Sequence, residues 1–124
     1  MRGKEPLLLV ADRRNHRLQY FTLDGKHVKF STGVDLPCHF DDRHGVLLVP
    51  DLAARVTLMD RNDQVITHLG ADATGNYRQL RVEAREKFIP GKFVCPHGAC
   101  FDHKGNIFVV EWVEVGRVTK LQKV

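Results

Sequence analysis

The chain repeats one short pattern three times, and this repetition limits its possible folds more than any other feature. In each copy an apolar run ends at an acidic residue, and an arginine a few residues later opens a second, alternating run. The acid–arginine pairs are Asp12 with Arg17, Asp51 with Arg55, and Glu111 with Arg117. Short runs of alternating apolar and polar residues, bounded by turn residues, predict strands joined in hairpins.

The repeated runs predict strands in three groups. The expected strands are 7–12, 17–22 and 27–31, then 38–41, 46–50, 55–59 and 65–69, and finally 98–101, 107–111 and 117–122. Asp24-Gly25, between the second and third runs, is a strong signal for a hairpin turn. Repeats of about 40 residues with four short strands each are typical of β-propeller blades. We therefore expect an all-β fold of four-stranded antiparallel blades, in which the first blade lacks its inner strand and the third its outer strand.

The 124 residues are enough for one domain and too few for two. We expect residues 1–124 to form a single partial propeller, with blade 1 at 5–33, blade 2 at 34–70 and blade 3 at 93–124. Residues 71–92 form an excursion between blades 2 and 3, the kind of loop in which functional residues are often found. Within it, residues 79–88 are compatible with a helix of about two to three turns.

Composition and charge exclude several classes of protein. No apolar run approaches the ~18 residues of a membrane-spanning helix, and Met1 to Pro6 is too polar to begin a signal peptide. The net charge is +4, but the 19 basic residues are scattered among 15 acidic ones, so nucleic acid is not the expected partner. No membrane association is expected either.

The chain has three cysteines, Cys38, Cys95 and Cys100, so at least one thiol is unpaired. An odd count favours a reducing compartment such as the cytoplasm. The spacing of Cys95 and Cys100 is wider than the tight pair of a zinc ribbon, and buried unpaired thiols are the favoured interpretation.

The segment Val10 to Phe21, followed by Asp24-Gly25, resembles an NHL repeat, and Asp12, Asn15, His16 and Arg17 carry the match. The resemblance implies a six-bladed β-propeller, of which this chain would be half. The order of segments is similar to the C-terminal half of the peptidylglycine amidating lyase family and its bacterial relatives. Cys95-Pro96-His97-Gly98, at the start of the last blade, is the second segment that carries this similarity. The resemblance also implies a bacterial origin.

In that family, Pro-His pairs on inner strands supply histidines to a zinc ion near the central channel. The resemblance makes His97 one candidate ligand, while in Pro37-Cys38-His39 the cysteine interrupts the pair. His39 and Cys38 are therefore weaker candidates. Catalytic zinc sites commonly use three histidines and a water, so one chain cannot complete the site. Zinc or calcium as a cofactor stays open, and the favoured alternative is that His97 lines a solvent-filled funnel without an ion.

The repeated acidic residues have a structural explanation. Asp12, at the end of a strand, can accept hydrogen bonds from backbone N–H groups of the following turn, and Arg17 can pair with it. The same role is expected of Asp51 and Glu111. Glu111 and Glu114 could instead form a catalytic carboxylate pair, but the repeat position of Glu111 favours the structural role.

Two functions fit this sequence. The first, and favoured, is a non-catalytic NHL-type module for binding or assembly, with an unidentified small-molecule or peptide ligand. The alternative is a zinc-dependent lyase or hydrolase whose site is shared between chains. Both require a closed ring, which needs about four to eight blades, so we expect a homodimer of two half-rings related by a twofold axis.

Overall fold

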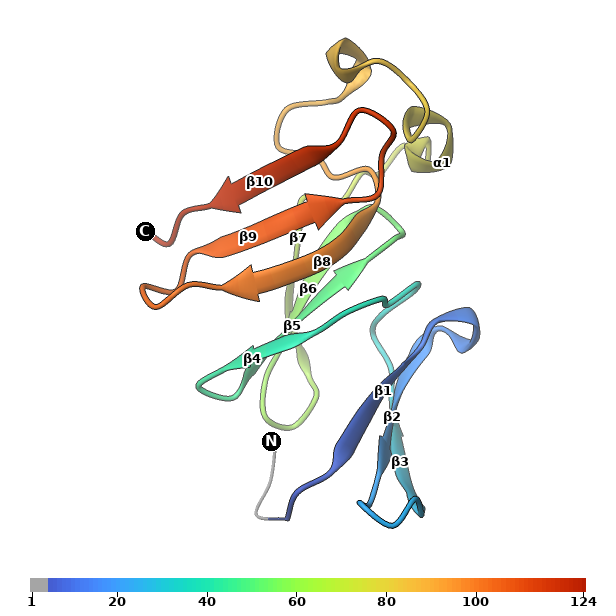
Figure 1. Cartoon of the computed structure of the whole chain (residues 1–124), viewed down its shortest axis with the longest axis vertical. Helices are drawn as coiled ribbons and strands as arrows, with labels where there is room; N and C mark the ends of the chain where they lie inside the picture. Colours follow the sequence, from blue (N-terminus) through green and yellow to red (C-terminus); the bar gives the residue numbers. More distant parts are fainter. Residues whose placement is uncertain (1–4) are drawn as a thin grey trace.

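The computed structural model describes residues 5–124, which form three antiparallel sheets (Figure 1). The strands of sheet 1 are β1 (Leu8–Asp12), β2 (Arg17–Phe21) and β3 (His27–Ser31). Sheet 2 consists of β4 (Asp41–Arg43), β5 (Val46–Asp51), β6 (Arg55–Met59) and β7 (Val65–Leu69). Sheet 3 consists of β8 (Pro96–Phe101), β9 (Ile107–Glu111) and β10 (Arg117–Leu121). The expected all-β class and the grouping into three, four and three strands are confirmed.

The expectation that no signal peptide is present concerns Met1 to Pro6, most of which lies outside the described residues. Within residues 5–124, no helix is long and apolar enough to cross a membrane.

The internal repeat is visible in the geometry of sheets 1 and 2. The β2–β3 turn is closed by the N–H of Thr22 donating to the carbonyl of Lys26, and the β6–β7 turn by the N–H of Asp60 donating to the carbonyl of Gln64, each at 2.9 Å. The register also shifts at the same repeat position, between Tyr20 and Phe21 in β2 and between 58 and 59 in β6. A bulge recurring at one place marks a built feature of the repeat rather than a local defect.

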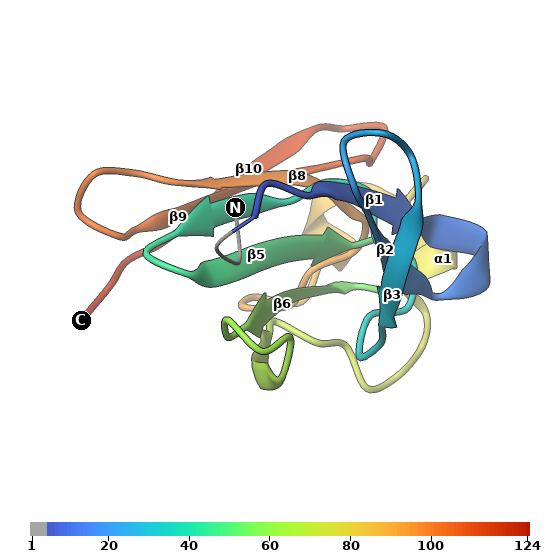
Figure 2. The same ribbon diagram turned by 90° about the horizontal axis from the view of Figure 1, so that it is seen from below.

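Two apolar clusters hold the sheets together, and sheet 2 contributes to both, so it lies between the other two (Figures 1 and 2). The period of two along each strand explains this arrangement, because alternate residues point to opposite faces. In β5, Leu47 and Val49 pack toward sheet 1, while Leu48 packs toward sheet 3. Each fully buried leucine contributes about 1.5–3 kcal/mol relative to an exposed one.

The inner strand of sheet 2 begins later than expected, at Asp41 instead of residue 38. Pro37 makes only an isolated bridge with Asp51, and Cys38 reaches the carbonyl of Pro50 with its N–H at 3.3 Å. Proline has no N–H to donate to a ladder, so regular pairing starts only after the chain has passed this point.

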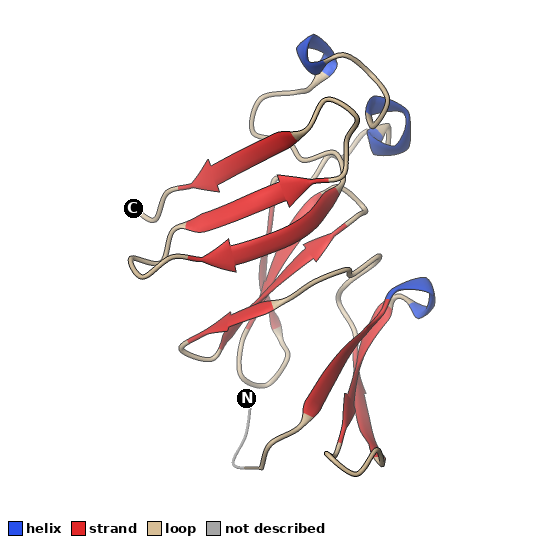
Figure 3. Cartoon of the chain, viewed as in Figure 1, coloured by secondary structure: helices blue, strands red, loops and turns tan. Residues whose placement is uncertain are grey.

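The excursion does not form the single helix expected over residues 79–88. It contains α1 (Tyr77–Leu80) and a separate 3-10 turn, η2 (Arg85–Lys87), and another such turn, η1 (Arg13–Asn15), follows β1 (Figure 3). The N–H of Glu114 donates to the carbonyl of Arg81 at 3.1 Å. This tertiary hydrogen bond takes the carbonyl that a longer helix would use, so the helix ends. A third cluster packs beneath the excursion and includes Leu52, Phe88, Val94, Cys95 and Val113.

Within residues 5–124, the two end sheets each leave one apolar face uncovered. On sheet 1, Leu8, Val10 and Phe30 are exposed, and on sheet 3, Val110 and Val118 are exposed, the last at 68%. Within residues 5–124, β1 and β10 each have a hydrogen-bonded neighbour on one side only. These two surfaces are called the sheet 1 free face and the sheet 3 free face below.

Candidate functional site

The repeated acidic residues lie at strand ends and organise the loops around them. Asp51 is fully buried, and its carboxylate accepts the backbone N–H groups of Asp35 and Leu36 at 2.7 Å and of Ala53 at 3.0 Å. Arg55, directly opposite in the register, adds an N–H at 3.4 Å. One carboxylate therefore ties the loop that enters sheet 2 to the turn that follows β5.

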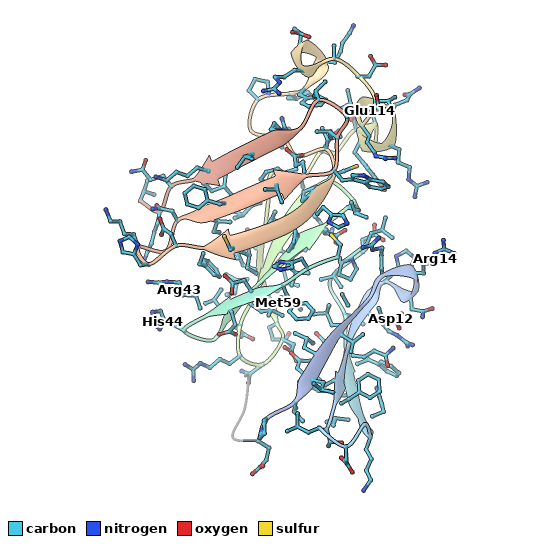
Figure 4. The ribbon with its side chains drawn as sticks, in the orientation of Figure 1. Asp12, Arg14, Arg43, His44, Met59 and Glu114 are labelled. Atoms are coloured by element: carbon cyan, nitrogen blue, oxygen red, sulfur yellow. The ribbon has the colours of Figure 1, made fainter. Side chains whose placement is uncertain are left out.

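Glu111 has the same role in sheet 3. It is buried, and it accepts the backbone N–H of Val94 at 2.6 Å and the guanidinium of Arg117, its cross-strand neighbour. Arg117 also donates to the carbonyl of Lys92 at 2.8 Å. Glu114, the other half of the considered carboxylate pair, lies in the exposed turn after β9 (Figure 4). These hydrogen bonds agree with a structural role for Glu111, as expected from its repeat position.

Asp12 differs from the expectation in one respect. Within the described residues its carboxylate accepts side-chain donors, from Arg17 at 2.8 Å, Asn15 at 2.8 Å and Gln19 at 2.6 Å, and not the backbone N–H groups of the following turn. The turn folds as η1, and its Asn15 amide occupies the position next to the carboxylate. The hydrogen bonds from Arg17 and then Asn15 hold the pKa of Asp12 below its ordinary value.

His16 has left-handed backbone geometry at the end of η1, with φ of 55°. Its Nδ1 lies 2.9 Å from the carbonyl oxygen of Asp35 and 2.6 Å from its carboxylate. The motif histidine thus links the β1–β2 turn to the loop that leads into sheet 2.

His97 lies on β8 at a bulge, since the register shifts between Pro96 and Gly98. A bulge changes the direction of the side chain it carries, and the imidazole of His97 meets the ring of Trp112 edge-on, with centroids 6.2 Å apart. Burial, and then the charges of Arg13 and His39, hold the pKa of His97 below its ordinary value. These effects favour the neutral form of His97.

The other two candidate ligands lie before β4. His39 is exposed and stacks against Phe40, with ring centroids 6.5 Å apart. Cys38 is half-buried, and its thiol lies 3.2 Å from the carbonyl of Pro96 and 3.5 Å from that of Pro50. Burial raises the pKa of the Cys38 thiol to about 11. Since the thiolate is the form that binds metals, Cys38 is a poor ligand in this environment.

Within residues 5–124, no three side chains of histidine, cysteine, aspartate or glutamate gather as a metal site requires. His97 and His39 are close enough for the charge of one to affect the pKa of the other, but no third donor joins them. The described residues therefore do not form a zinc or calcium site within one chain.

The expectation of buried thiols is correct for Cys95 and wrong for Cys100. All three cysteines are unpaired, and Cys100 is exposed. Cys100 alternates with Ala99 along β8, and because Ala99 packs toward sheet 2, Cys100 points toward the sheet 3 free face.

A pocket of about 280 Å³ opens beside Trp112 and the excursion. We call it the rim pocket. Its cationic group, Arg81, lies over the ring of Trp112 at 3.3 Å from guanidinium carbon to ring centroid. The buried Nε of Arg81 has no hydrogen-bond partner within the described residues. The lining residues are Leu36, Leu52, Tyr77, Arg78, Arg81, Cys95 and Trp112.

The rim pocket combines an apolar floor with aromatic and cationic side chains, which is the composition of a ligand site. An arginine stacked on tryptophan presents a fixed guanidinium, and its unsatisfied N–H groups suit a carboxylate or another planar acceptor. The arrangement can bind and orient such a ligand.

The sequence patterns did not single out Arg78 or Arg81. The one sequence signal for these arginines was the length of the excursion. In the structure, the hydrogen bond from Glu114 to Arg81 holds the excursion against the segment that follows β9. No protein-family model matches the chain, and no curated protein matches it either.

Proposed function

We propose that this chain is an NHL-type propeller module for binding or assembly, non-catalytic as it stands, and that two copies close one six-bladed ring. The observation that carries the proposal is the pair of uncovered apolar faces at the two ends of the sheet array. A soluble monomer rarely exposes contiguous apolar surface of this kind, and such surface marks an interaction site.

The sheet 1 free face repeats the side of sheet 2 that packs on sheet 1. With Asp12 aligned to Asp51, Leu8 and Val10 take the positions of Leu47 and Val49. The latter pair is buried against sheet 1. The free face thus carries side chains of the type used between neighbouring blades.

The sheet 3 free face repeats the opposite side of sheet 2. With Glu111 aligned to Asp51 and Arg117 to Arg55, Phe108 takes the position of Leu48, and Val118 that of Val56. Leu48 and Val56 are fully buried against sheet 3. Each chain therefore carries one face of each kind, and the sheet 3 free face of one copy fits the sheet 1 free face of another.

Two such junctions close a ring around a twofold axis without leaving either face open. In that ring the rim pocket would lie at one end of the propeller, where ligands commonly bind. Arg81, with Trp112 beneath it, favours a small molecule or peptide that carries a carboxylate.

The free faces can be tested with one charge. Val118→Lys places a cation in the proposed junction, where burying it without a partner is costly, so sedimentation velocity should show a shift from dimer to monomer. Ile66→Lys is the matched control, because Ile66 is also exposed, at 54%, but lies on the outer strand of the complete sheet. A Val118→Lys protein that sediments as the wild type does would contradict the proposed junction.

A zinc-dependent lyase or hydrolase with a site shared between chains is the second candidate. The observation in its favour is that His97, whose neutral form is favoured and which is displaced by a bulge, lies near His39 from the neighbouring sheet. Metal analysis of the purified protein tests it. Stoichiometric zinc that is lost in His97→Ala would support this candidate, and zinc content unaffected by that substitution would reject it.

A further inference from the structure

A second and larger pocket lies between sheets 2 and 3, separate from the rim pocket. Its volume is about 480 Å³, within the usual range for small-molecule sites. The residues that line it come from β6 and β7 on one side and from β8, β9 and β10 on the other. Its apolar wall consists of Leu58, Leu69, Phe101, Ile107 and Leu121.

Two cations lie at one end of this inter-sheet pocket. Arg43, the last residue of β4 (Figure 4), and Lys123, just after β10, both line it. They approach each other over Gly105. A Cβ atom on that glycine would lie 3.2 Å from Cδ of Lys123 and 3.4 Å from Nη1 of Arg43.

No carboxylate neutralises this pair within the described residues, since neither cation has an ion-pair partner there. The nearby carboxylates are already engaged. Asp41 accepts the N–H of Phe101 at 2.8 Å, and Asp102 accepts the side-chain amide of Asn106 at 2.7 Å. Two cations that line one pocket and form no ion pair within the described residues favour an anionic ligand.

Hydrogen bonds across the two sheets hold the cationic end in place. The guanidinium of Arg43 donates through Nη2 to the carbonyl of His103 at 2.9 Å, which leaves its other N–H groups available. The backbone N–H of Lys123 donates to the side chain of Asn106 at 3.0 Å. The guanidinium of Arg43 and the backbone at Lys123 are thus tied to the β8–β9 turn.

We infer that the inter-sheet pocket binds a monocarboxylate with an apolar tail, the class to which medium-chain fatty acids belong. The tail packs between the leucine and aromatic side chains, where burial of each CH₂ group favours binding. The carboxylate lies at the cationic end, where Arg43 offers the planar donors that suit it. Neither group is part of the rim pocket, so this inference is independent of the function proposed above.

Calorimetric titration of the full chain with decanoate tests this assignment, with decanol as the uncharged analogue of equal tail length. We expect saturable binding of decanoate and at least tenfold weaker binding of decanol. The single tryptophan, Trp112, lines the rim pocket and not the inter-sheet pocket. Its fluorescence should therefore stay unchanged during the titration.

Two variants separate a role in binding from a role in folding. Lys123→Gln removes a charge whose side chain makes no hydrogen bond within the described residues, and it should weaken decanoate binding about tenfold. Arg43→Gln also loses the hydrogen bond to His103, so its binding is interpreted only after unfolding curves show a folded protein. Lys104→Gln is the matched control, since Lys104 is exposed on the same turn but does not line the pocket.

The inference is overturned by any of three results. These results are an absence of decanoate binding to the wild-type protein, decanol binding as tight as decanoate binding, and a loss of binding in Lys104→Gln as large as in Lys123→Gln. A change in Trp112 fluorescence that follows the binding curve would place the ligand in the rim pocket and also contradict the inference.

Discussion

Asp51 and Asp12 occupy the same repeat position but are bonded to different groups. Asp51 is fully buried and accepts backbone N–H groups from both flanking segments, whereas Asp12 is bonded to side chains. The cost of losing a carboxylate depends on what it leaves behind, because a buried N–H without an acceptor is expensive while a side chain can turn to water.

We therefore expect Asp51→Ala to lower the free energy of unfolding by about 3 kcal/mol, because backbone N–H groups lose their acceptor and Arg55 loses its ion-pair partner. Asp12→Ala should cause a smaller loss. Urea unfolding of both variants measures the difference. Equal losses at the two positions would show that the backbone hydrogen bonds to Asp51 are not what makes it important, and an unchanged Asp12→Ala would remove the structural role of that residue.

The electrostatics of His97 can be measured directly. Burial lowers the pKa of its imidazole, and Arg13 adds to this effect. The unfolded chain therefore takes up this proton first as pH falls through the ordinary value of 6.5, and His97 contributes stability that is present above this pH and lost below it. NMR titration should show a pKa of His97 below 6.5 that rises toward it in Arg13→Gln. Arg14→Gln is the control, and an equal rise in both variants would argue against a specific effect of Arg13.

The three thiols should differ in reactivity. Cys100 is exposed, whereas burial raises the pKa of Cys95 and raises that of Cys38 to about 11. Since the thiolate is the reactive form, a disulfide reagent at pH 8 should modify Cys100 first and the other two slowly in the Val118→Lys variant, in which the sheet 3 free face that carries Cys100 stays open to solvent. Cys100→Ser should remove the fast phase. A fast phase that survives this substitution would show that the thiol at position 38 or 95 is more accessible than in the structure.

Among the elements, strands could be predicted far better than the excursion. The alternation in β2 and β10 follows from one covered face each, and turn residues such as Asp24-Gly25 marked where strands end. The predicted boundaries of elements were wrong where contacts between distant residues determine them. Pro37 moves the start of β4 to Asp41. The hydrogen bond from the N–H of Glu114 to the carbonyl of Arg81 ends α1 earlier than expected. A single sequence does not contain these contacts in any local pattern.

The candidate site shows the same division. His97 could be selected from its motif, but the bulge that turns it toward Trp112 could not, because a bulge depends on the register of two strands. Arg81 and Lys123 are ordinary basic residues in the sequence. They become candidates only when folding places Arg81 over Trp112 and Lys123 beside Arg43.

The connection between sheet 2 and the excursion turns at Gly70, which has φ of 64° and lies against Phe93. A Cβ atom there would approach the Phe93 ring to 2.4 Å, so Gly70→Ala combines backbone strain with displacement of a core aromatic. Gly25 has φ of 87° and open space around it. We expect a loss of about 1 kcal/mol in Gly25→Ala, and about 3 kcal/mol in Gly70→Ala, in thermal or urea unfolding. Similar losses in both would mean that Phe93 moves aside at no cost.

At the scale of the whole molecule, the two end sheets each have three strands beside the four of sheet 2, and each leaves one apolar face uncovered within residues 5–124. Edge strands and apolar faces are sites of association. In the proposed alignment, the sheet 1 free face repeats one side of sheet 2 and the sheet 3 free face repeats the other side, so the two free faces are expected to fit each other. Closure by a second copy is therefore the central claim about the assembly.

The absolute mass in solution, measured by light scattering behind size exclusion over a range of concentrations, tests this claim most directly. The chain has a mass of 14.1 kDa, and two half-rings closing one propeller predict twice that value, with no larger species as concentration rises. A mass of 14.1 kDa at all concentrations would contradict closure by self-association. The shared metal site would then be contradicted with it, whereas the inter-sheet pocket, which lies within one chain, would still stand.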